Sequence, residues 1–394
     1  MDFLRTRVMS NGLIRTWHLF AKQSIPILVF LVGVMAPCQM VGQRIVEYDS
    51  ASAAQAEALS RKALELMGTD QFDAAIVQWK KALDLVPGYA PFQYEMALTY
   101  VMSKSYAKAL STLLPIYTDD RLYDRGYQLM GNIHDMMGDS AKSRPYYESG
   151  LKRYPFSGRL HYEMGAAAMV ANNVDEAIRW WKKGTVAEPA YSTTYYWLAR
   201  TYARRPDRIW AAFYAEAFLN LDRGSERTKE ISKLIYDVWN DGIRFGHDRD
   251  PIMFCSEELL NVPSPGGPNV MSFPVAFEFT IATAGQHLIP EKGIKDTLSL
   301  AELVDLRTRF LRSWKAAGYD TLYPNSIISW QQKILASGWI KEYFYWLNSF
   351  GDRRSMTQYY TKNDQRYDTF LAWFGQNIIP TDKPLCLDLD CQKQ

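Results

Sequence analysis

Two stretches decide the fold, VQWKKALDLVP at residues 77–87 and RWWKKGTVAEP at residues 179–189, because they share nearly the same sequence pattern. Each contains an aromatic residue, two lysines, a small residue and, six positions after the second lysine, a proline. The two stretches lie 102 residues apart, which is three times 34. Recurrence at multiples of a period of this size indicates a repeat architecture, in which each repeat is one supersecondary unit.

A frame of 34-residue blocks accounts for this recurrence without gaps through five blocks, which start at residues 56, 90, 124, 158 and 192. The eighth and twentieth positions of every block are small, and the twenty-fourth is large in most blocks. Small residues on two segments of a block predict two helices whose backbones approach closely, with the large side chain filling the space beside them. The small residues are Ala63, Ala97, Gly131, Gly165 and Ala199 at position 8, and Ala75, Ala109, Ser143, Ala177 and Ala211 at position 20.

Prolines and turn residues mark the ends of the predicted helices. Pro87, Pro155 and Pro189 occupy the thirty-second position of their blocks, where a proline ends the second helix because it cannot continue one. Turn residues such as Asn172-Asn173 separate the two helices of a block. The second and fifth blocks depart from this pattern, since each has an arginine at position 32.

Residues 56 to about 225 resemble the tetratricopeptide repeat, a helix–turn–helix unit of 34 residues with small residues at positions 8 and 20 and proline at position 32. The resemblance implies an all-α fold, a right-handed α-solenoid of about five helix pairs whose first helices line a concave groove. It also implies that a protein or peptide partner binds in that groove. The lysine pairs fall on second helices, where we expect Lys80 and Lys182 to lie on a solvated outer face.

Positions 5 and 9 of the first helices commonly face the groove in such repeats. Tyr, Asn, Gln and Arg suit an extended peptide there, because amides and guanidinium groups hydrogen-bond a peptide backbone and tyrosines give rigid contact area. We expect these side chains to be mostly exposed; the alternative is that the tyrosines pack within and between helices. The expected groove residues are Tyr94, Gln128, Asn132, Tyr162, Tyr196 and Arg200.

Residues 1–42 have the pattern of a signal peptide. Basic residues, among them Arg15 and Lys22, precede the apolar run IPILVFLVGVMA at residues 25–36. This run is shorter than a membrane span of about 20 residues and fits a signal-peptide core of roughly 7–15 residues. We therefore predict an exported protein, periplasmic, envelope-associated or secreted, with a linker at 43–55. The alternatives are membrane association through a retained N-terminal anchor and a lipid on Cys38; the length of the basic segment leaves open a true start at Met9.

Export changes the prediction for the cysteines, because an oxidising compartment permits disulfides. We predict a disulfide between Cys386 and Cys391, which enclose four residues in the sequence CLDLDC. Cys255 is expected to be a small buried hydrophobic residue.

The 34-residue frame disappears in residues 226–394, and this half resembles no family that we can identify. The segment after residue 225 should pack onto the last repeat, because the apolar end of a solenoid needs a cap. We predict a helical domain with a loop at 261–274 and a flexible tail from about residue 380. Its aromatic residues, such as Trp314, Trp330 and Tyr343, are expected in the core; the alternative is a pocket for a ring-shaped ligand. Helices are predicted at 228–243, 299–318, 326–351 and 355–375.

The functional prediction is a scaffold rather than an enzyme. The sequence contains no nucleophile elbow, P-loop, H-E-x-x-H motif or dinucleotide fingerprint, so we predict no catalytic residue, no metal site and no cofactor. The net charge of +2 argues against a nucleic-acid partner. We expect an exported scaffold or adaptor that binds a protein or peptide partner within a cell-envelope assembly. The alternative is an enzyme or carbohydrate-binding protein with its site in 226–394 and the repeats as a docking module.

Overall fold

The computed structural model describes residues 48–245, 252–264, 270–291, 293, 295 and 297–390, and these residues form an all-α fold. Extended pairing within them is confined to two isolated bridges, Ile243 with Ile252 and Phe245 with Lys295. The chain forms two compact units, one ending at Gly150 and one beginning at Leu151, and each is described by itself. The predicted signal peptide lies outside the described residues. No helix in the described ranges is long and apolar enough to cross a membrane.

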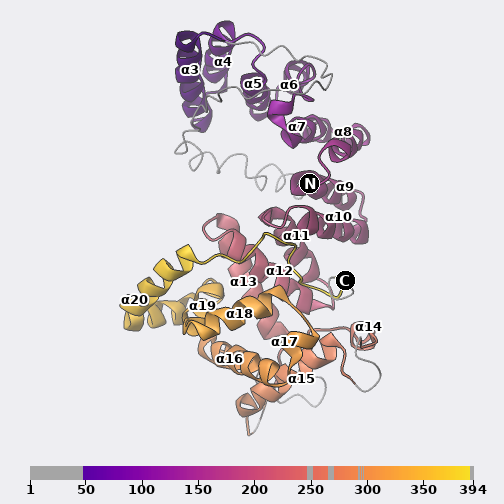
Figure 1. Cartoon of the computed structure of the whole chain (residues 1–394), viewed down its shortest axis with the longest axis vertical. Helices are drawn as coiled ribbons and strands as arrows, with labels where there is room; N and C mark the ends of the chain where they lie inside the picture. The colour runs from indigo at the N-terminus through magenta and orange to yellow at the C-terminus, as the bar shows by residue number, and fades with distance from the viewer. Residues whose placement is uncertain are drawn as a thin grey trace, which may run out of the picture. The chain divides into compact units, whose positions relative to one another are not determined.

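The first unit consists of helix pairs that follow the predicted frame (Figure 1). Ala90 and Asp124 begin α5 and α7, which confirms two predicted block boundaries. Helix α3 begins at Ser50, inside the predicted linker 43–55, because the Asp49 carboxylate accepts hydrogen bonds from backbone N–H groups of the first turn and so caps the helix. The elements are α3 (Ser50–Gly68), α4 (Phe72–Leu85), α5 (Ala90–Met102), α6 (Tyr106–Leu113), η1 (Asp120–Leu122), α7 (Asp124–Met136) and α8 (Ser140–Arg153), the last of which contains the boundary between the units.

The second unit contains the fourth and fifth blocks and the rest of the described chain. Gly158 and Ser192 begin α9 and α11, again at predicted boundaries. Helix α13 begins at Glu226, 34 residues after Ser192, so the frame continues for one helix beyond the five predicted blocks. Its eighth position is Lys233 rather than a small residue, which is why the sequence pattern ended at residue 225. The elements are α9 (Gly158–Val170), α10 (Val174–Ala187), α11 (Ser192–Tyr202), α12 (Arg208–Leu221), α13 (Glu226–Asp241), α14 (Glu257–Leu260), α15 (Phe273–Gly285), η2 (Gln286–Leu288), α16 (Leu300–Ala316), α17 (Tyr319–Leu322), α18 (Ser326–Ala336), α19 (Ile340–Leu347) and α20 (Arg353–Gln376).

In the third and fourth blocks the small residue at position 8 lies beneath the large residue at position 24. A Cβ atom added at Gly131 would lie 2.2 Å from the ring of Tyr147, and one added at Gly165 would lie 2.2 Å from the indole nitrogen of Trp181. Ala75 and Ala177, at position 20, are fully buried. The tetratricopeptide-like register predicted for residues 56 to about 225 is therefore confirmed in the packing, since position 8 must be small where a ring covers it.

Helix α12 is buried on all sides, because the C-terminal half covers the last repeat. Every residue from 211 to 220 is buried. Helices α13 and α18 both pack against α12, as expected of the segment after residue 225. The ring of Trp210 stacks on that of Phe273 of α15, with 5.9 Å between ring centroids and 11° between planes. Trp314, Trp330 and Tyr343 are buried as core residues, whereas Phe279 and Tyr360 of the same half are exposed.

A buried ion pair joins α12 to three helices of the C-terminal half. The carboxylate of Glu216 lies 2.7 Å from the guanidinium group of Arg307 on α16, and their side chains are 1% and 3% exposed. The other oxygen of Glu216 accepts hydrogen bonds from Gln331 of α18 and Tyr343 of α19, both at 2.7 Å. The Glu216 carboxylate is thus satisfied by three donors, while Nη1 of Arg307 is buried without a hydrogen-bond partner among the described residues and the guanidinium group lies over the rings of Trp239 and Phe344.

One helix prediction for this half needs correction, and one 13-residue helix was missed. The predicted helix at 326–351 is two helices, because Gly338 adopts a left-handed φ of 81° and separates α18 from α19. Helix α15 was not predicted, since an element apolar on all faces has no periodic signal. Helix α20 matches the prediction and is kinked at Asn363, whose side-chain amide donates a hydrogen bond to the Tyr359 carbonyl at 2.8 Å.

The predicted flexible tail from about residue 380 is wrong for the part that the structure describes. Ile379 and Leu387 are buried, and Cys386 exchanges two hydrogen bonds of 2.8 Å with Ser326 at the start of α18. Figure 1 shows this segment, in yellow, running back from α20 towards the repeat helices. Cys391 lies outside the described residues, so its disulfide with Cys386 stays a prediction. Cys255 is a free, partly buried thiol.

Candidate functional site

The first-helix face of the first unit carries three of the six expected groove residues, and all three are buried. Tyr94 lies on α5, and Gln128 and Asn132 lie on α7, each with at most 5% of its surface exposed. The side-chain oxygen of Asn132 accepts a hydrogen bond of 2.6 Å from the Tyr147 hydroxyl. The expectation that these side chains are mostly exposed is therefore wrong. Asn132 instead fixes the position of Tyr147, the large residue at position 24 of the same block.

The other three expected groove residues lie in the second unit, and two of them pack between helices. Tyr162 is fully buried and stacks on Trp197, with 6.5 Å between ring centroids. The hydroxyl of Tyr196 donates a hydrogen bond of 2.6 Å to Glu230 of α13. Burial, and then this hydrogen bond, raise the pKa of Tyr196 above its usual range. The alternative that tyrosines pack within and between helices thus describes Tyr162 and Tyr196, while Arg200 keeps 22% of its side chain exposed.

Arginines and one tyrosine are the more accessible side chains of this face. Arg200 lies 5.0 Å from the centroid of Trp197, and Arg227 lies 5.3 Å from that of Tyr196. Arg159 lies over the ring of Tyr191 at 6.0 Å. Cations over ring faces are attracted by the ring quadrupole, and guanidinium N–H groups at the edge of such a stack can still donate hydrogen bonds. We call this group the arginine face; it consists of Arg159, Tyr191, Arg200 and Arg227, all partly exposed.

Charge compensation limits what the arginine face can bind. Arg200 pairs with Glu230 at 3.1 Å, and Arg227 pairs with Asp222 at 3.0 Å. Because their charges are matched, these arginines offer directional N–H donors rather than a strong positive field. Such a surface suits peptide carbonyl groups, and it agrees with the weak net charge of the whole chain. Of these four residues only Arg200, at position 9, was predicted for the groove; Arg227 lies beyond the five predicted blocks, and Tyr191 precedes α11.

The first unit has its own charged pair on this face. Arg125 lies 5.0 Å from the centroid of the Tyr94 ring, and its charge acts on the neighbouring Glu95. Burial raises the pKa of Glu95 to about 7, and Arg125 offsets part of that rise. One oxygen of Glu95 is buried without a hydrogen-bond partner among the described residues. Glu95 therefore changes its charge near neutral pH, which the sequence pattern did not indicate because position 6 has no assigned role in the frame.

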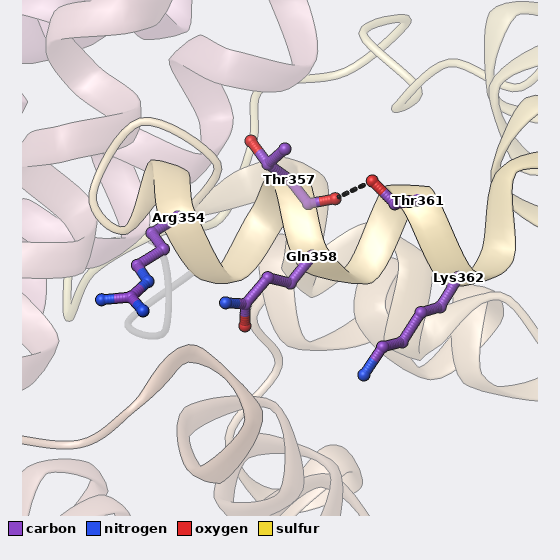
Figure 2. Close-up of a pocket in the computed structure, with 5 residues that line it drawn as sticks. All are labelled: Arg354, Thr357, Gln358, Thr361 and Lys362. Atoms are coloured by element: carbon purple, nitrogen blue, oxygen red, sulfur yellow. Dashed lines mark hydrogen bonds between the residues drawn. The ribbon is translucent and has the colours of Figure 1, made fainter.

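Two shallow depressions occur on the C-terminal helices. The first, of about 410 Å³, lies along one face of α20, where Arg354, Gln358 and Lys362 project to the same side (Figure 2). The second, of about 390 Å³, is lined by α16 and α18, with Arg312, Lys315 and Gln332 as its polar residues. Neither lining contains a carboxylate, a histidine or a cysteine. Within the described ranges there is also no group of three or more metal-ligating side chains.

No known family model matches this chain, and no curated protein matches it. Solved structures similar to part of it include the MamA protein, at 17% identity over 43% of this chain and 92% of that chain, with a TM-score of 0.33. The Cut9-Hcn1 hetero-tetramer of the APC/C is similar at 15% identity over 48% of this chain and 37% of that chain, with a TM-score of 0.38. YrrB, described as a TPR protein with an unusual peptide-binding site, is similar at 16% identity over 45% of this chain and 91% of that chain, with a TM-score of 0.30.

Proposed function

We propose that this chain is a scaffold that binds a protein or peptide partner on the first-helix faces of its repeats. The observation that carries the proposal is the arginine face. Arg159, Arg200 and Arg227 stack on aromatic rings that fix their positions, and each keeps part of its side chain accessible. Donors held in place lose little entropy on binding, so such a surface can bind a peptide backbone without a deep pocket.

Export and a place in a cell-envelope assembly are part of this proposal. They rest on the basic and apolar segments of residues 1–42, which have the order and length of a signal peptide. A partner inside the envelope is then the expected ligand. N-terminal sequencing of the protein purified from its native cell tests this part, and an intact chain in the soluble cytoplasmic fraction would contradict it.

The site on the C-terminal helices is the competing candidate. Its two depressions are lined by cationic and amide side chains and by threonines, without the paired acid and base that hydrolytic chemistry needs. This composition supports a scaffold more than an enzyme or a carbohydrate-binding protein. The competing candidate is retained as an outcome of the experiment below.

Site-specific photocrosslinking in the native cell tests the proposal. A photoreactive residue replaces Tyr191 on the arginine face, Gln358 in the α20 depression, or Val186 on the outer surface of α10, which is 60% exposed. We expect one protein to be crosslinked from position 191 and not from position 186, with its identity read by mass spectrometry. Crosslinking from position 358 alone would assign the binding to the C-terminal helices and make the repeats a docking module.

A further inference from the structure

The end of the described chain occupies a polar site on the second helices of the fourth and fifth repeats. Asp388 is only 8% exposed although it is charged. One of its carboxylate oxygens lies 2.8 Å from the ammonium group of Lys182 on α10, and the same oxygen accepts a hydrogen bond of 2.6 Å from the hydroxyl of Tyr214 on α12. The ammonium group also contacts the carboxylate of Asp390. Lys182 therefore does not lie on a solvated outer face, as the repeat pattern predicted.

The repeat helices surround this contact with aromatic side chains. The rings of Tyr202 and Tyr214 are stacked with 5.7 Å between centroids and 4° between planes, and they form an aromatic wall beside Lys182. Lys182 is 24% exposed, so its charge is partly removed from water. A partly buried ammonium group without a carboxylate would be unfavourable, because desolvation of an unpaired charge is costly. The site therefore needs an anionic occupant.

The occupying segment is held mainly at residues that precede its two carboxylates. Cys386 pairs with Ser326, and the carbonyl of Leu387 accepts a hydrogen bond of 3.4 Å from Asn325. The backbone N–H of Asp390 donates to the other oxygen of Asp388 at 3.0 Å, which sets the spacing of the two acids. Lys182 then meets two carboxylates two residues apart, which a bend and turn at residues 388–390 bring to the same side. Their release would leave the anchor at Ser326 in place.

We infer that Lys182, Tyr202 and Tyr214 form a binding site for an acidic peptide whose backbone turns so that two carboxylates, two residues apart, face the same side, a site which the chain's own Asp388 and Asp390 fill. Lys182 and Tyr214 lie on second helices and Tyr202 is the last residue of α11, and none of the three belongs to the arginine face. Occupancy within one chain has an effective concentration that can reach the millimolar range, so a peptide from another molecule competes poorly until the tail is released. The tail thus acts as a built-in competitor for acidic ligands of this surface.

Binding of a labelled peptide to the full-length chain tests the inference. The probe is a fluorescent peptide of residues 383–390 with Cys386→Ser, which prevents disulfide exchange. The wild-type chain is compared with the double variant Asp388→Asn, Asp390→Asn, and with the same variant that also carries Lys182→Gln. We expect the double variant to bind the peptide at least tenfold more tightly than the wild type, and the Lys182→Gln form to lose that gain. A probe with both aspartates replaced by asparagine should not bind any form.

A second measurement keeps the inference testable if the double variant folds poorly. Tyr214→Phe keeps the ring and removes the hydroxyl that donates to Asp388. Hydrogen exchange across residues 388–390 should then be at least tenfold faster than in the wild type, with the exchange of Cys386 and of α16 unchanged. Unchanged exchange in this segment would overturn the inference. So would a well-folded double variant that does not bind the probe, or probe binding that persists after Lys182→Gln.

Discussion

Position 25 of the frame lies on the second helix in the first, fourth and fifth blocks, and these blocks place it in three different surroundings. In the first block it is Lys80, which is exposed. In the fourth it is Lys182, which pairs with two aspartates of the C-terminal segment. In the fifth it is Glu216, which is fully buried against Arg307. The comparison teaches that the repeat frame sets where a side chain points, while the segment that covers it decides whether it is solvated, paired or buried.

Glu216→Ala should have the largest effect on stability. It leaves the guanidinium group of Arg307 buried and unpaired, and breaking such a pair from one side costs about 3–5 kcal/mol. Urea denaturation followed by circular dichroism measures the loss. The matched change at the same position of the first block, Lys80→Ala, should alter the free energy of unfolding by less than about 0.5 kcal/mol. Equal effects of the two changes would remove the distinction between covered and uncovered blocks.

Gly165→Ala should have the next largest effect. The added methyl group would meet the indole of Trp181 at 2.2 Å, and overpacking of this kind costs about 1–3 kcal/mol. Gly68→Ala is the control, because a methyl group there meets no atom within 4 Å and the φ angle is not left-handed. We expect the control to melt at or slightly above the wild-type temperature, since alanine favours helix more than glycine does. A Gly165→Ala chain as stable as wild type would contradict the packing of position 8 beneath position 24.

The pH dependence of the first unit should be smaller. The pKa of Glu95 is raised to about 7 in the folded state, from an ordinary value near 4.5, so the folded chain binds more protons between these values. The free energy of unfolding should therefore fall as the pH rises from about 4.5 to about 7. Above about pH 7 the contribution of Glu95 to this free energy should no longer change with pH. Solvent that reaches this partly exposed side chain reduces the amplitude. Glu95→Gln should flatten this part of the melting profile; a profile unchanged by the substitution would show that another group is responsible.

The comparison also shows how much could be predicted from the sequence. The helix starts at Ala90, Asp124, Gly158 and Ser192 followed from the period alone, because small residues and prolines are local signals. The surroundings of position 25 could not be predicted, since Asp388 lies 206 residues from Lys182 in the chain and Arg307 lies 91 residues from Glu216.

The sequence predicted which helix positions carry the candidate site, but it did not predict which of their side chains are exposed. Frame positions located Arg200 on the correct helix, with part of its side chain exposed. The burial of Tyr196 could not be anticipated, because its hydrogen-bond partner Glu230 lies on α13, beyond the recognised blocks. The amino-acid composition of α12 does indicate that another segment covers this helix. After Arg208 this helix has no basic residue, unlike α4 with its two lysines, and an outer face without lysine indicates a covering segment.

The most direct test of the proposed function compares arginines on the two faces of the second unit. Arg159→Gln with Arg200→Gln alters the first-helix face, and Arg153→Gln with Arg179→Gln alters exposed arginines on second helices. The measurement is the dissociation constant for the partner identified by crosslinking at position 191, with melting curves of each variant as a check on folding. We predict at least tenfold weaker binding for the first pair, equal to about 1.4 kcal/mol, and unchanged binding for the second. Unchanged binding for the first pair, in a variant that melts like wild type, would contradict the proposal that the first-helix face holds the partner.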